Sequence, residues 1–432
     1  MAIRPLKLGL AGLGTVGAAL TRLLASRRDD FAARTGRAVE IVAVSARSRG
    51  ARGLPLGGAA FHADVRELAA QADIDVFVEL IGGEEGPAYD AVRAALARGV
   101  HVVTANKAML SAHGVELAEM AEKSGVALAF EAAVGGGVPV IKTLRESLAG
   151  NRIQRVSGIL NGTCNYILSK METERLPFDL CLKEAQRLGY AEADPTFDVG
   201  GFDTAHKLSI LAALAFGARI DSEAVSVEGI ESITLADLAA ADDLGFRVKL
   251  LGVAQRTDHG VEQRVHPTMV AKSTPLAQTM GVLNGVTIDG DAVGALTLVG
   301  PGAGGDATAS AVAADLADIA RGNIAPAFGR PVAALAEPER ASLQRHEGGY
   351  YVRLSVLDRP GSMAILARRM ADRAISLESI VQKRALGDAG AYVSVVIVTH
   401  ATTETSIREA LALTLEDGVV REKPQVIRIE RP

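Results

Sequence analysis

The sequence contains little cysteine, no clustered positive charge and no long apolar run. Its two cysteines, Cys164 and Cys181, are too few for a disulfide framework or a thiolate metal cluster, and a reducing cytosol is the natural compartment. No basic block exceeds two or three residues, and the formal net charge is −5, so no nucleic-acid surface is expected. No stretch has the roughly 18 apolar residues of a membrane span, and the N-terminus lacks a signal-peptide pattern. We therefore expect a cytoplasmic protein that binds neither nucleic acid nor membrane.

The composition that remains is that of a globular protein. Hydrophobic residues make up 48% and charged residues 22% of the 432 residues, and this length suggests about two to four domains. Within the first 138 residues, short apolar runs alternate with segments of helical spacing, which predicts a parallel, doubly wound sheet. The expected strands cover residues 6–12, 39–46, 75–83, 99–107 and 126–137.

The pattern changes after residue 138, where we expect an α+β domain over 139–304. Antiparallel strands are predicted at 249–256 and 261–270, and helices at 163–175, 178–188, 203–216 and 235–244. Three prolines and mixed charge indicate a linker over 322–348. The last part, 349–432, follows the βαββαβ order of a ferredoxin-like domain.

A glycine fingerprint follows the first expected strand. Gly12, Gly14 and Gly17 match G-x-G-x-x-G where a helix opens, and this context predicts a dinucleotide site rather than an ordinary strand–helix turn. The free N–H groups of the helix start, at Thr15 and Val16, favour a pyrophosphate.

The second expected strand ends without the acid that usually binds the ribose of NAD. Arg47 and Arg49 stand there instead, and guanidinium groups pair bidentately with phosphate. This arrangement favours NADP(H), with NAD(H) also possible. The competing interpretation is a solvated basic loop.

Two further segments have residues suited to chemistry at the ends of strands. Thr104 and Lys107 follow the fourth strand, and a lysine at a helix start opposes the helix dipole, which favours a functional role over a surface one. Glu131 begins a glycine-rich turn that also includes Val134, Gly136 and Val138. The oxygens of this turn are suited to a hard cation. An equally good interpretation is that the turn is a simple hinge between domains.

Acidic residues gather beside one lysine in the segment 188–211. Asp203 and Lys207 are four residues apart and share one helical face. Their spacing also fits a helix cap with an ordinary ion pair. The acids match neither an EF-hand loop nor a zinc site. An amino-acid substrate fits better, because carboxylates bind an ammonium group and lysines bind a carbonyl or carboxylate.

Several segments, in order over residues 6–320, resemble the homoserine dehydrogenases. They are GLGTVG, VELIGG, HVVTANKAMLSAHG, FEAAVGGGVPVI, GILNGTCNYIL, EAQRLGYAEADPTFDVGGFDTAHKLSIL and GPGAGGDATASAVAADLADI. The segment LSVLDRPGSMAILARRMADRAISLESIVQ resembles an ACT domain. Together they resemble the longer, single-activity bacterial form, which implies a Rossmann-type domain over 1–138 completed by a helix at 305–320, a substrate and dimerisation domain, and a C-terminal ACT domain over 349–432.

The resemblance implies the reversible reduction of L-aspartate 4-semialdehyde to L-homoserine by NAD(P)H in a homodimer or homotetramer. Lys107 and Lys207 would surround the reacting carbonyl, with Asp203 positioning Lys207. The remaining site residues follow from matched motifs: Glu192, Asp198 and Tyr190 for the substrate, Gly304 for the cofactor, and Glu131 with the backbone of Val134, Gly136 and Val138 for a monovalent cation such as Na⁺.

The ACT resemblance implies an amino-acid effector, L-threonine, at the loop that contains Asp358, Pro360 and Gly361. Helix-start N–H groups would receive its carboxylate. The alternative is that this unit serves assembly alone. Other interpretations of the whole chain are a different oxidoreductase on the same scaffold, such as an aspartate dehydrogenase or a semialdehyde dehydrogenase, and an inactive amino-acid sensor.

Overall fold

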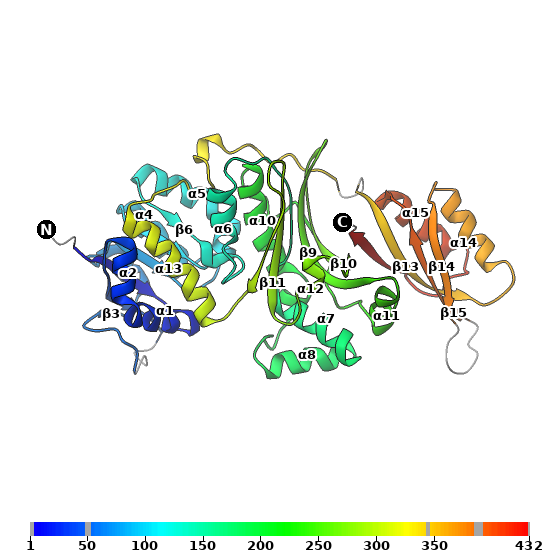
Figure 1. Ribbon diagram of the computed structural model, residues 1–432, viewed down its shortest axis with the longest axis horizontal. Helices are drawn as coiled ribbons and strands as arrows, with labels where there is room; N and C mark the ends of the chain where they lie inside the picture. Colours follow the sequence, from blue (N-terminus) through cyan, green and yellow to red (C-terminus); the bar gives the residue numbers. More distant parts are fainter. Residues whose placement is uncertain (1–3, 48–52, 343–345, 384–391, 431–432) are drawn as a thin grey trace.

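The computed structural model describes residues 4–47, 53–342, 346–383 and 392–430. Three parts follow one another along the long axis (Figure 1), and the chain starts at one end of the molecule. In the described part of the chain, no helix is both long enough and apolar enough to cross a membrane.

The first part is built on a six-stranded parallel sheet with the order β3-β2-β1-β4-β5-β6. The inner strands β1, β4, β5 and β6 are mostly buried and rich in valine and leucine, as parallel strands covered on both faces must be, whereas β2 is about half buried and the edge strand β3 is more open. Their bounds are β1 Leu6–Ala11, β2 Val39–Ser45, β3 Ala60–His62, β4 Val76–Glu79, β5 His101–Thr104 and β6 Leu128–Ala129.

Helices cover both faces of this sheet: α1 Thr15–Ser26, α2 Arg28–Thr35, α3 Val65–Gln71, α4 Pro87–Ala97 and α5 Lys107–Ser124. The helix α13 (Gly305–Arg321) returns from the second part and packs against α1 (Figure 1). The strand expected over 126–137 was too long. Only Leu128–Ala129 is extended, and the chain then forms a 3₁₀ turn, Glu131–Ala133, and a bend in which Gly135 and Gly136 have positive φ.

The second part contributes one side of an eleven-stranded mixed sheet, in the order β12-β11-β7-β9-β10. Its strands are β7 Ile153–Ile159, β8 Val225–Val227, β9 Phe246–Thr257, β10 Gly260–Ala271, β11 Leu283–Gly290 and β12 Gly294–Pro301. The hairpin of β11 and β12 was not predicted. The helices are α6 Val140–Lys142, the π-helix Thr143–Ser147, α7 Gly162–Glu174, α8 Phe178–Arg187, α9 Thr196–Val199, α10 Phe202–Phe216, α11 Leu235–Asp243 and α12 Pro275–Gln278.

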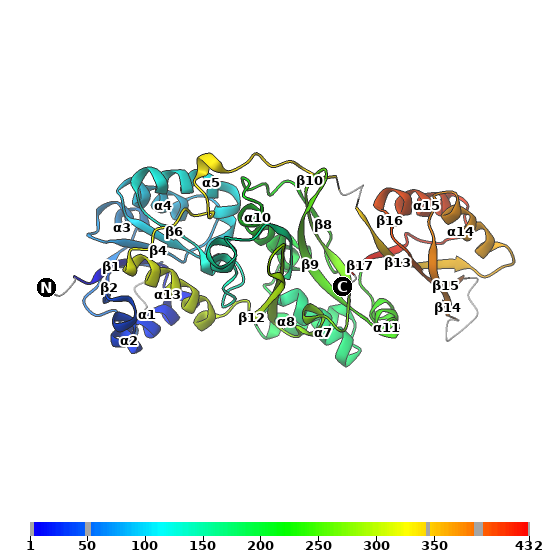
Figure 2. The same ribbon diagram turned by 45° about the horizontal axis from the view of Figure 1, so that its top comes forward.

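The C-terminal part continues the same sheet in the order β17-β13-β15-β14. Its elements follow the expected βαββαβ order, with a short extra strand β16: β13 Glu347–Leu357, α14 Ser362–Ala371, β14 Leu377–Lys383, β15 Tyr392–Thr399, β16 Thr402–Thr403, α15 Glu404–Glu416 and β17 Gln425–Glu430. The last strand, β17, lies parallel to β10 and joins the two halves of the sheet (Figure 2).

The segment expected to be a linker is packed against the body of the protein over its described residues. Phe328 is 1% exposed, and its ring packs against that of Phe130 in a tilted arrangement with 5.5 Å between the ring centroids. The guanidinium of Arg340 donates to both carboxylate oxygens of Asp221 at 2.6 and 2.7 Å. This segment therefore has a fixed course rather than that of a free tether.

Candidate active site

The glycine turn after β1 has the geometry that a dinucleotide requires. A Cβ added at Gly17 would lie 2.0 Å from the carbonyl oxygen of Gly12, and one at Gly12 would lie 2.6 Å from that of Leu80. An added Cβ at Gly14 would meet nothing within 4 Å. Gly12 and Gly17 thus permit close packing of the turn, while Gly14 leaves the N-terminus of α1, with Thr15 and Val16, open to a phosphate.

A cavity of about 1000 Å³ lies beside this turn and fits a dinucleotide. Arg47 lines it at the end of β2, where there is no acid. Arg66 also lines it but donates to both carboxylate oxygens of Asp64. The sequence analysis did not identify Arg66 as a candidate. Arg49 lies outside the described residues.

The glycine-rich start of α13 lies beside the glycine turn that follows β1. Gly304 caps α13 with a φ of +108°, and a Cβ added at Gly305 would lie 3.0 Å from the carbonyl oxygen of Thr15. The structure thus brings Gly304 beside the N-terminus of α1, although 289 residues separate Gly304 from Thr15.

The lysine after β5 lies on the same edge of the sheet. Ala11, Glu79 and Thr104 are neighbours in register at the ends of β1, β4 and β5, so the turns that follow them share one edge. Thr104 is fully buried, and its hydroxyl donates to Glu79 at 2.6 Å. Asn106 caps α5 by accepting the N–H of Met109, which fixes the start of the helix at Lys107.

One buried carboxylate holds both lysines. Asp203 Oδ1 lies 2.8 Å from Lys107 Nζ, and Asp203 Oδ2 lies 2.7 Å from Lys207 Nζ. The predicted i,i+4 pair of Asp203 and Lys207 is therefore confirmed. The residue that caps α10 is Gly201, and Asp203 makes no capping bond. Lys207 also donates to the carbonyl oxygen of Leu160 at 2.7 Å.

The electrostatics keep Asp203 ionised. Burial by itself raises the pKa of this carboxyl group, but the ammonium groups of Lys207 and Lys107 outweigh burial and place its pKa well below its ordinary value. The three charged groups are thus only partly open to solvent, since the side chains of Lys107 and Lys207 are 34% and 12% exposed.

Asn161 completes this cluster and was missed from the sequence. Its side-chain N–H groups donate to Asp198 at 2.8 Å and to Asp203 at 2.9 Å, while its oxygen accepts the N–H of Cys164 and caps α7. Burial raises the pKa of Asp198, opposed by the Asn161 hydrogen bond. An asparagine before a helical run was the available signal, because asparagine is a favoured cap.

The other predicted substrate residues are more open to solvent. Tyr190 is 43% exposed, and its backbone carbonyl accepts the hydroxyl of Thr163. The side chain of Glu192 is exposed. His206, expected to be structural, packs its ring edge-on against Phe197, and burial lowers its pKa.

The predicted cation loop is folded around a buried acid. Both carboxylate oxygens of Glu131 accept backbone N–H groups, from Ile141 at 3.0 Å and Lys142 at 2.8 Å. Burial, with the nearby Asp315, raises the pKa of Glu131 to about 7. The carboxylate therefore faces α6, so a cation in this turn would rest on the backbone carbonyls of Val134, Gly136 and Val138. The described residues contain no group of three or more acidic, histidine or cysteine side chains suited to a metal.

The predicted effector residues line a cavity of about 250 Å³ in the C-terminal part. Asp358, Pro360 and Gly361 lie between β13 and α14, and Gln382 from β14 forms part of the wall. Gly361 caps α14 with a φ of +92°. The cavity thus opens onto a helix start, where free N–H groups favour an anion.

Comparison with known proteins agrees with this geometry. Residues 139–317 match the family model for homoserine dehydrogenase, and residues 12–131 match the model for its NAD-binding domain. The homoserine dehydrogenase of Pseudomonas aeruginosa is 44% identical over 416 residues, which cover 95% of each chain.

Solved structures give the same relationship. The crystal structure of a homoserine dehydrogenase from Thiobacillus denitrificans superposes with a TM-score of 0.93 at 41% identity, covering 99% of this chain and 98% of that one. A hyperthermophilic archaeal homoserine dehydrogenase in complex with NADPH has a TM-score of 0.63 at 27% identity, covering 73% of this chain and 97% of that one. The chain belongs to the homoserine dehydrogenase family, whose members are NAD(P)-dependent oxidoreductases.

Proposed function

We propose that this enzyme reversibly reduces L-aspartate 4-semialdehyde to L-homoserine. The observation that carries the assignment of roles is the single carboxylate of Asp203, which holds the ammonium groups of Lys107 and Lys207 at the cofactor edge of the parallel sheet. A bound nicotinamide supplies the hydride for the aldehyde carbon. The protein must then stabilise and protonate the oxygen that receives the electron pair of the carbonyl bond.

Lys207 is the proposed donor to that oxygen. An ammonium group has three N–H donors, and two of those of Lys207 are used by Asp203 and by the carbonyl oxygen of Leu160. The third is free to donate to the developing alkoxide and to transfer its proton. Lys107, whose side chain is more exposed, binds the substrate, and Lys207 regains its proton from solvent after the transfer.

The acids beside this pair are the proposed ammonium site. Asp198 accepts a hydrogen bond from Asn161 and lies in the same network as Asp203. Glu192 and Tyr190, on the exposed segment before α9, close over the substrate from the solvent side. Together they recognise an amino acid rather than a simple aldehyde.

NADP(H) is the preferred coenzyme in this proposal, with NAD(H) as a second substrate. The support is Arg47 at the cavity wall after β2, in a position where an acid would select the ribose of NAD. Gly12, Gly14, Thr15, Val16 and Gly17 bind the pyrophosphate, and Thr104 and Gly304 border the nicotinamide side. A monovalent cation such as Na⁺ in the turn of Glu131 stiffens the connection to the second part.

For the C-terminal part we propose an ACT domain that binds L-threonine at the helix start beside Asp358, Pro360 and Gly361. The support is the βαββαβ order and the cavity at that helix start. The alternative is that this part serves assembly alone. The exposed valines of the edge hairpin, Val293 and Val299, support a homodimer or homotetramer built through β12.

A semialdehyde dehydrogenase is not supported by Cys164. That chemistry requires a reactive thiolate, but Cys164 is fully buried and burial raises the pKa of its thiol well above the ordinary value. Its Sγ donates to the carbonyl oxygen of Asp198.

The test follows NADPH absorbance with aspartate 4-semialdehyde. Wild-type enzyme turns over, whereas Lys207→Met and Lys107→Met lower kcat by about 10² to 10⁴. Lys123→Met, which removes an exposed lysine from the same helix as Lys107, keeps wild-type activity. Absence of turnover with either coenzyme would refute the assignment. Turnover that L-threonine does not change would leave the reaction intact and support the assembly alternative.

A further inference from the structure

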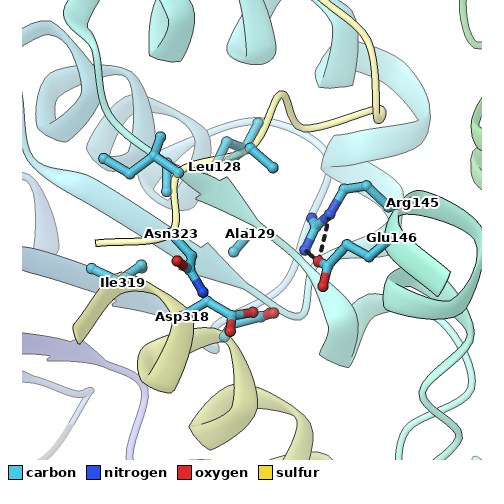
Figure 3. A pocket seen from close by; sticks show the side chains of 11 residues that line it. Leu128, Ala129, Arg145, Glu146, Asp318, Ile319 and Asn323 are labelled. Atoms are coloured by element: carbon cyan, nitrogen blue, oxygen red, sulfur yellow. Dashed lines mark hydrogen bonds and ion pairs between the residues drawn. The ribbon is translucent and has the colours of Figure 1, made fainter. Parts of the chain in front are cut away.

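The first part of the molecule contains acidic side chains of two kinds. Those around a polar cavity of about 350 Å³ are paired with cations: Arg145 donates to Glu146 at 2.7 Å (Figure 3), and Lys142 pairs with the two aspartates that line the cavity. Glu79, the last residue of β4, is 0% exposed, and no lysine, arginine or histidine among the described residues forms an ion pair with it. A buried charge without a counter-ion lowers stability unless hydrogen bonds compensate for its lost hydration.

Glu79 accepts three hydrogen bonds from the turn and the strand beside it. Its Oε1 accepts the backbone N–H groups of Ile81 at 2.7 Å and Gly82 at 2.9 Å, and its Oε2 accepts the hydroxyl of Thr104 at 2.6 Å. Hydrogen bonds to a carboxylate are stronger than those between neutral groups. They hold the turn in a conformation that favours glycine, since Gly82 and Gly83 have φ angles of +87° and +96°.

The hydrogen bonds continue from Thr104 into a closed ring. The hydroxyl oxygen of Thr104 accepts the backbone N–H of Asn106 at 3.0 Å, and the side-chain N–H of Asn106 donates to the carbonyl oxygen of Gly83 at 2.7 Å. The other end of the Asn106 amide caps α5. The ring thus joins the end of β4, the turn 80–83 and the start of α5, whose first residue is Lys107.

The turn held by this ring also borders the coenzyme cavity. Leu80 and Ile81 line that cavity, and Ile81 is 48% exposed. The backbone N–H of Leu80 donates to the carbonyl oxygen of Ala11 at 2.8 Å, and the Leu80 carbonyl lies directly against Gly12. The turn therefore contacts the glycine fingerprint on one side and, through Asn106, the start of α5 on the other.

We propose that Glu79 is a positioning residue for the reaction, an inference that rests on the proposed function. Because it is buried, Glu79 contacts neither coenzyme nor substrate. Its carboxylate fixes the turn 80–83 and, through Thr104 and Asn106, the start of α5, so that the coenzyme and Lys107 are held at a constant separation. A misplacement of about 1 Å between reacting groups can cost about 10²-fold in rate, which explains a buried acid without a counter-ion in this place.

Two variants break the ring at different points. Glu79→Met removes the acceptor of all three hydrogen bonds, whereas Asn106→Ser keeps a cap acceptor for α5 but is too short to reach Gly83. Both should bind NADPH about five- to tenfold more weakly and lower kcat by about tenfold or more. Glu79→Gln keeps an acceptor for the two backbone N–H groups and should recover most of the affinity. Fluorescence titration with NADPH and steady-state kinetics of the full-length protein measure these effects.

The matched control is an acid at the other end of the same strand. Asp75 precedes β4, accepts the backbone N–H of Lys7 at 2.9 Å and pairs with Arg37. Asp75→Ala should lower the midpoint of urea unfolding but leave the affinity for NADPH unchanged, because this edge of the sheet faces away from the coenzyme. An equal loss of NADPH affinity in Asp75→Ala and Glu79→Met would show a general effect of stability and overturn the proposal.

Hydrogen–deuterium exchange of the coenzyme-free protein gives a readout that does not depend on turnover. The amides of Ile81 and Gly82 should exchange faster in both ring variants than in wild type, with the amides of β1 unchanged. Unchanged exchange at these amides, or wild-type NADPH affinity in both ring variants, would overturn the proposal while leaving the proposed function intact. Wild-type protein that fails to bind NADPH would refute the proposed function, and this inference with it.

Discussion

The charged residues of the active site act through one shared carboxylate. Asp203 contacts a lysine from each of two helices, and Asn161 ties it to Asp198. An amide is suited to this place because its two N–H groups bridge two acids without adding charge. Asn161 is therefore expected to position the acids rather than react.

Replacing Asn161 separates its two roles. Asn161→Ala removes both the bridge and the cap of α7, whereas Asn161→Ser keeps a cap acceptor for the N–H of Cys164. Both variants should lose about 10- to 100-fold in kcat/KM, since the acids are no longer held in place. Only the alanine variant should lose about 1 kcal/mol of unfolding free energy. Steady-state kinetics and urea unfolding measure the two effects, and full activity of the serine variant would contradict the bridging role.

A second buried lysine predicts a pH effect on stability. Lys249 is 1% exposed and donates to Asn165 and to the carbonyl oxygen of Thr279, and no carboxylate among the described residues bonds to it. Burial lowers its pKa from 10.5 to about 8. Below pH 8 both folded and unfolded states carry the charge, and the folded state bears a penalty of about 3 kcal/mol. Between about 8 and 10.5 the unfolded state binds more protons, so stability rises with pH.

Lys249→Met removes this titration. Urea unfolding between pH 7.5 and 9.5 should show wild-type stability rising relative to that of the variant by about 1 to 2 kcal/mol. Lys170→Met serves as a control, because Lys170 pairs with an acid at the surface of α7. Parallel stability curves for wild type and Lys249→Met would contradict the lowered pKa.

At the scale of the element, the glycine turn and α1 form one strand–helix unit. Glycine is needed for a different reason at each position of the turn. Gly17 packs against the backbone of Gly12, whereas Gly14 faces open space and has an ordinary φ of −72°. Gly17 thus permits close packing, whereas Gly14 permits the approach of a ligand.

Two alanine variants should therefore have different defects, one in stability and the other in NADPH binding. Gly17→Ala should lower the melting temperature by several degrees, because a Cβ would collide with a backbone carbonyl. Gly14→Ala should melt like wild type but bind NADPH at least about tenfold more weakly, since its methyl group occupies the place of the pyrophosphate. Differential scanning fluorimetry and NADPH fluorescence measure these quantities. A loss of stability in Gly14→Ala equal to that in Gly17→Ala would contradict this division.

At the scale of the whole molecule, the catalytic and C-terminal parts share one sheet. The pairing of β10 with β17 joins them, and Asp237 of α11 adds a buried contact by accepting hydrogen bonds from Tyr351 and Arg353 of β13. Asp237 also forms the capping box of α11 with Thr234. The two parts are thus packed as one body rather than tethered.

Removal of this contact should destabilise the molecule strongly. Asp237→Ala leaves Arg353 without its counter-charge and should cost about 3 kcal/mol or more in unfolding free energy. Asp242→Ala removes an acid of the same helix that pairs with Lys272 at the surface, and should cost less than about 1 kcal/mol. Urea unfolding compares the two. Equal losses would show that the buried contact does not hold the parts together.

The sequence by itself determined what depends on near neighbours along the chain. The glycine turn follows from spacing within one strand–helix unit, the Asp203–Lys207 pair from the pitch of a helix, and the βαββαβ order from periodicity. Each is fixed by local geometry, so a short window of sequence contains it.

Only the tertiary structure decided contacts between distant segments. Lys107 and Asp203 are 96 residues apart. The sequence of α5 does not indicate that α10 supplies the partner of Lys107, and the sequence of α10 does not indicate the reverse. The β11–β12 hairpin escaped prediction because its strands are glycine-rich. The place of β17 beside β10 depends on backbone pairing and on contacts such as the ion pair of Arg264 with Glu430, whose residues lie far apart in the sequence. The sequence thus identifies the lysines and the acids as candidates, and only long-range packing brings Lys107 to the carboxylate that Lys207 also contacts.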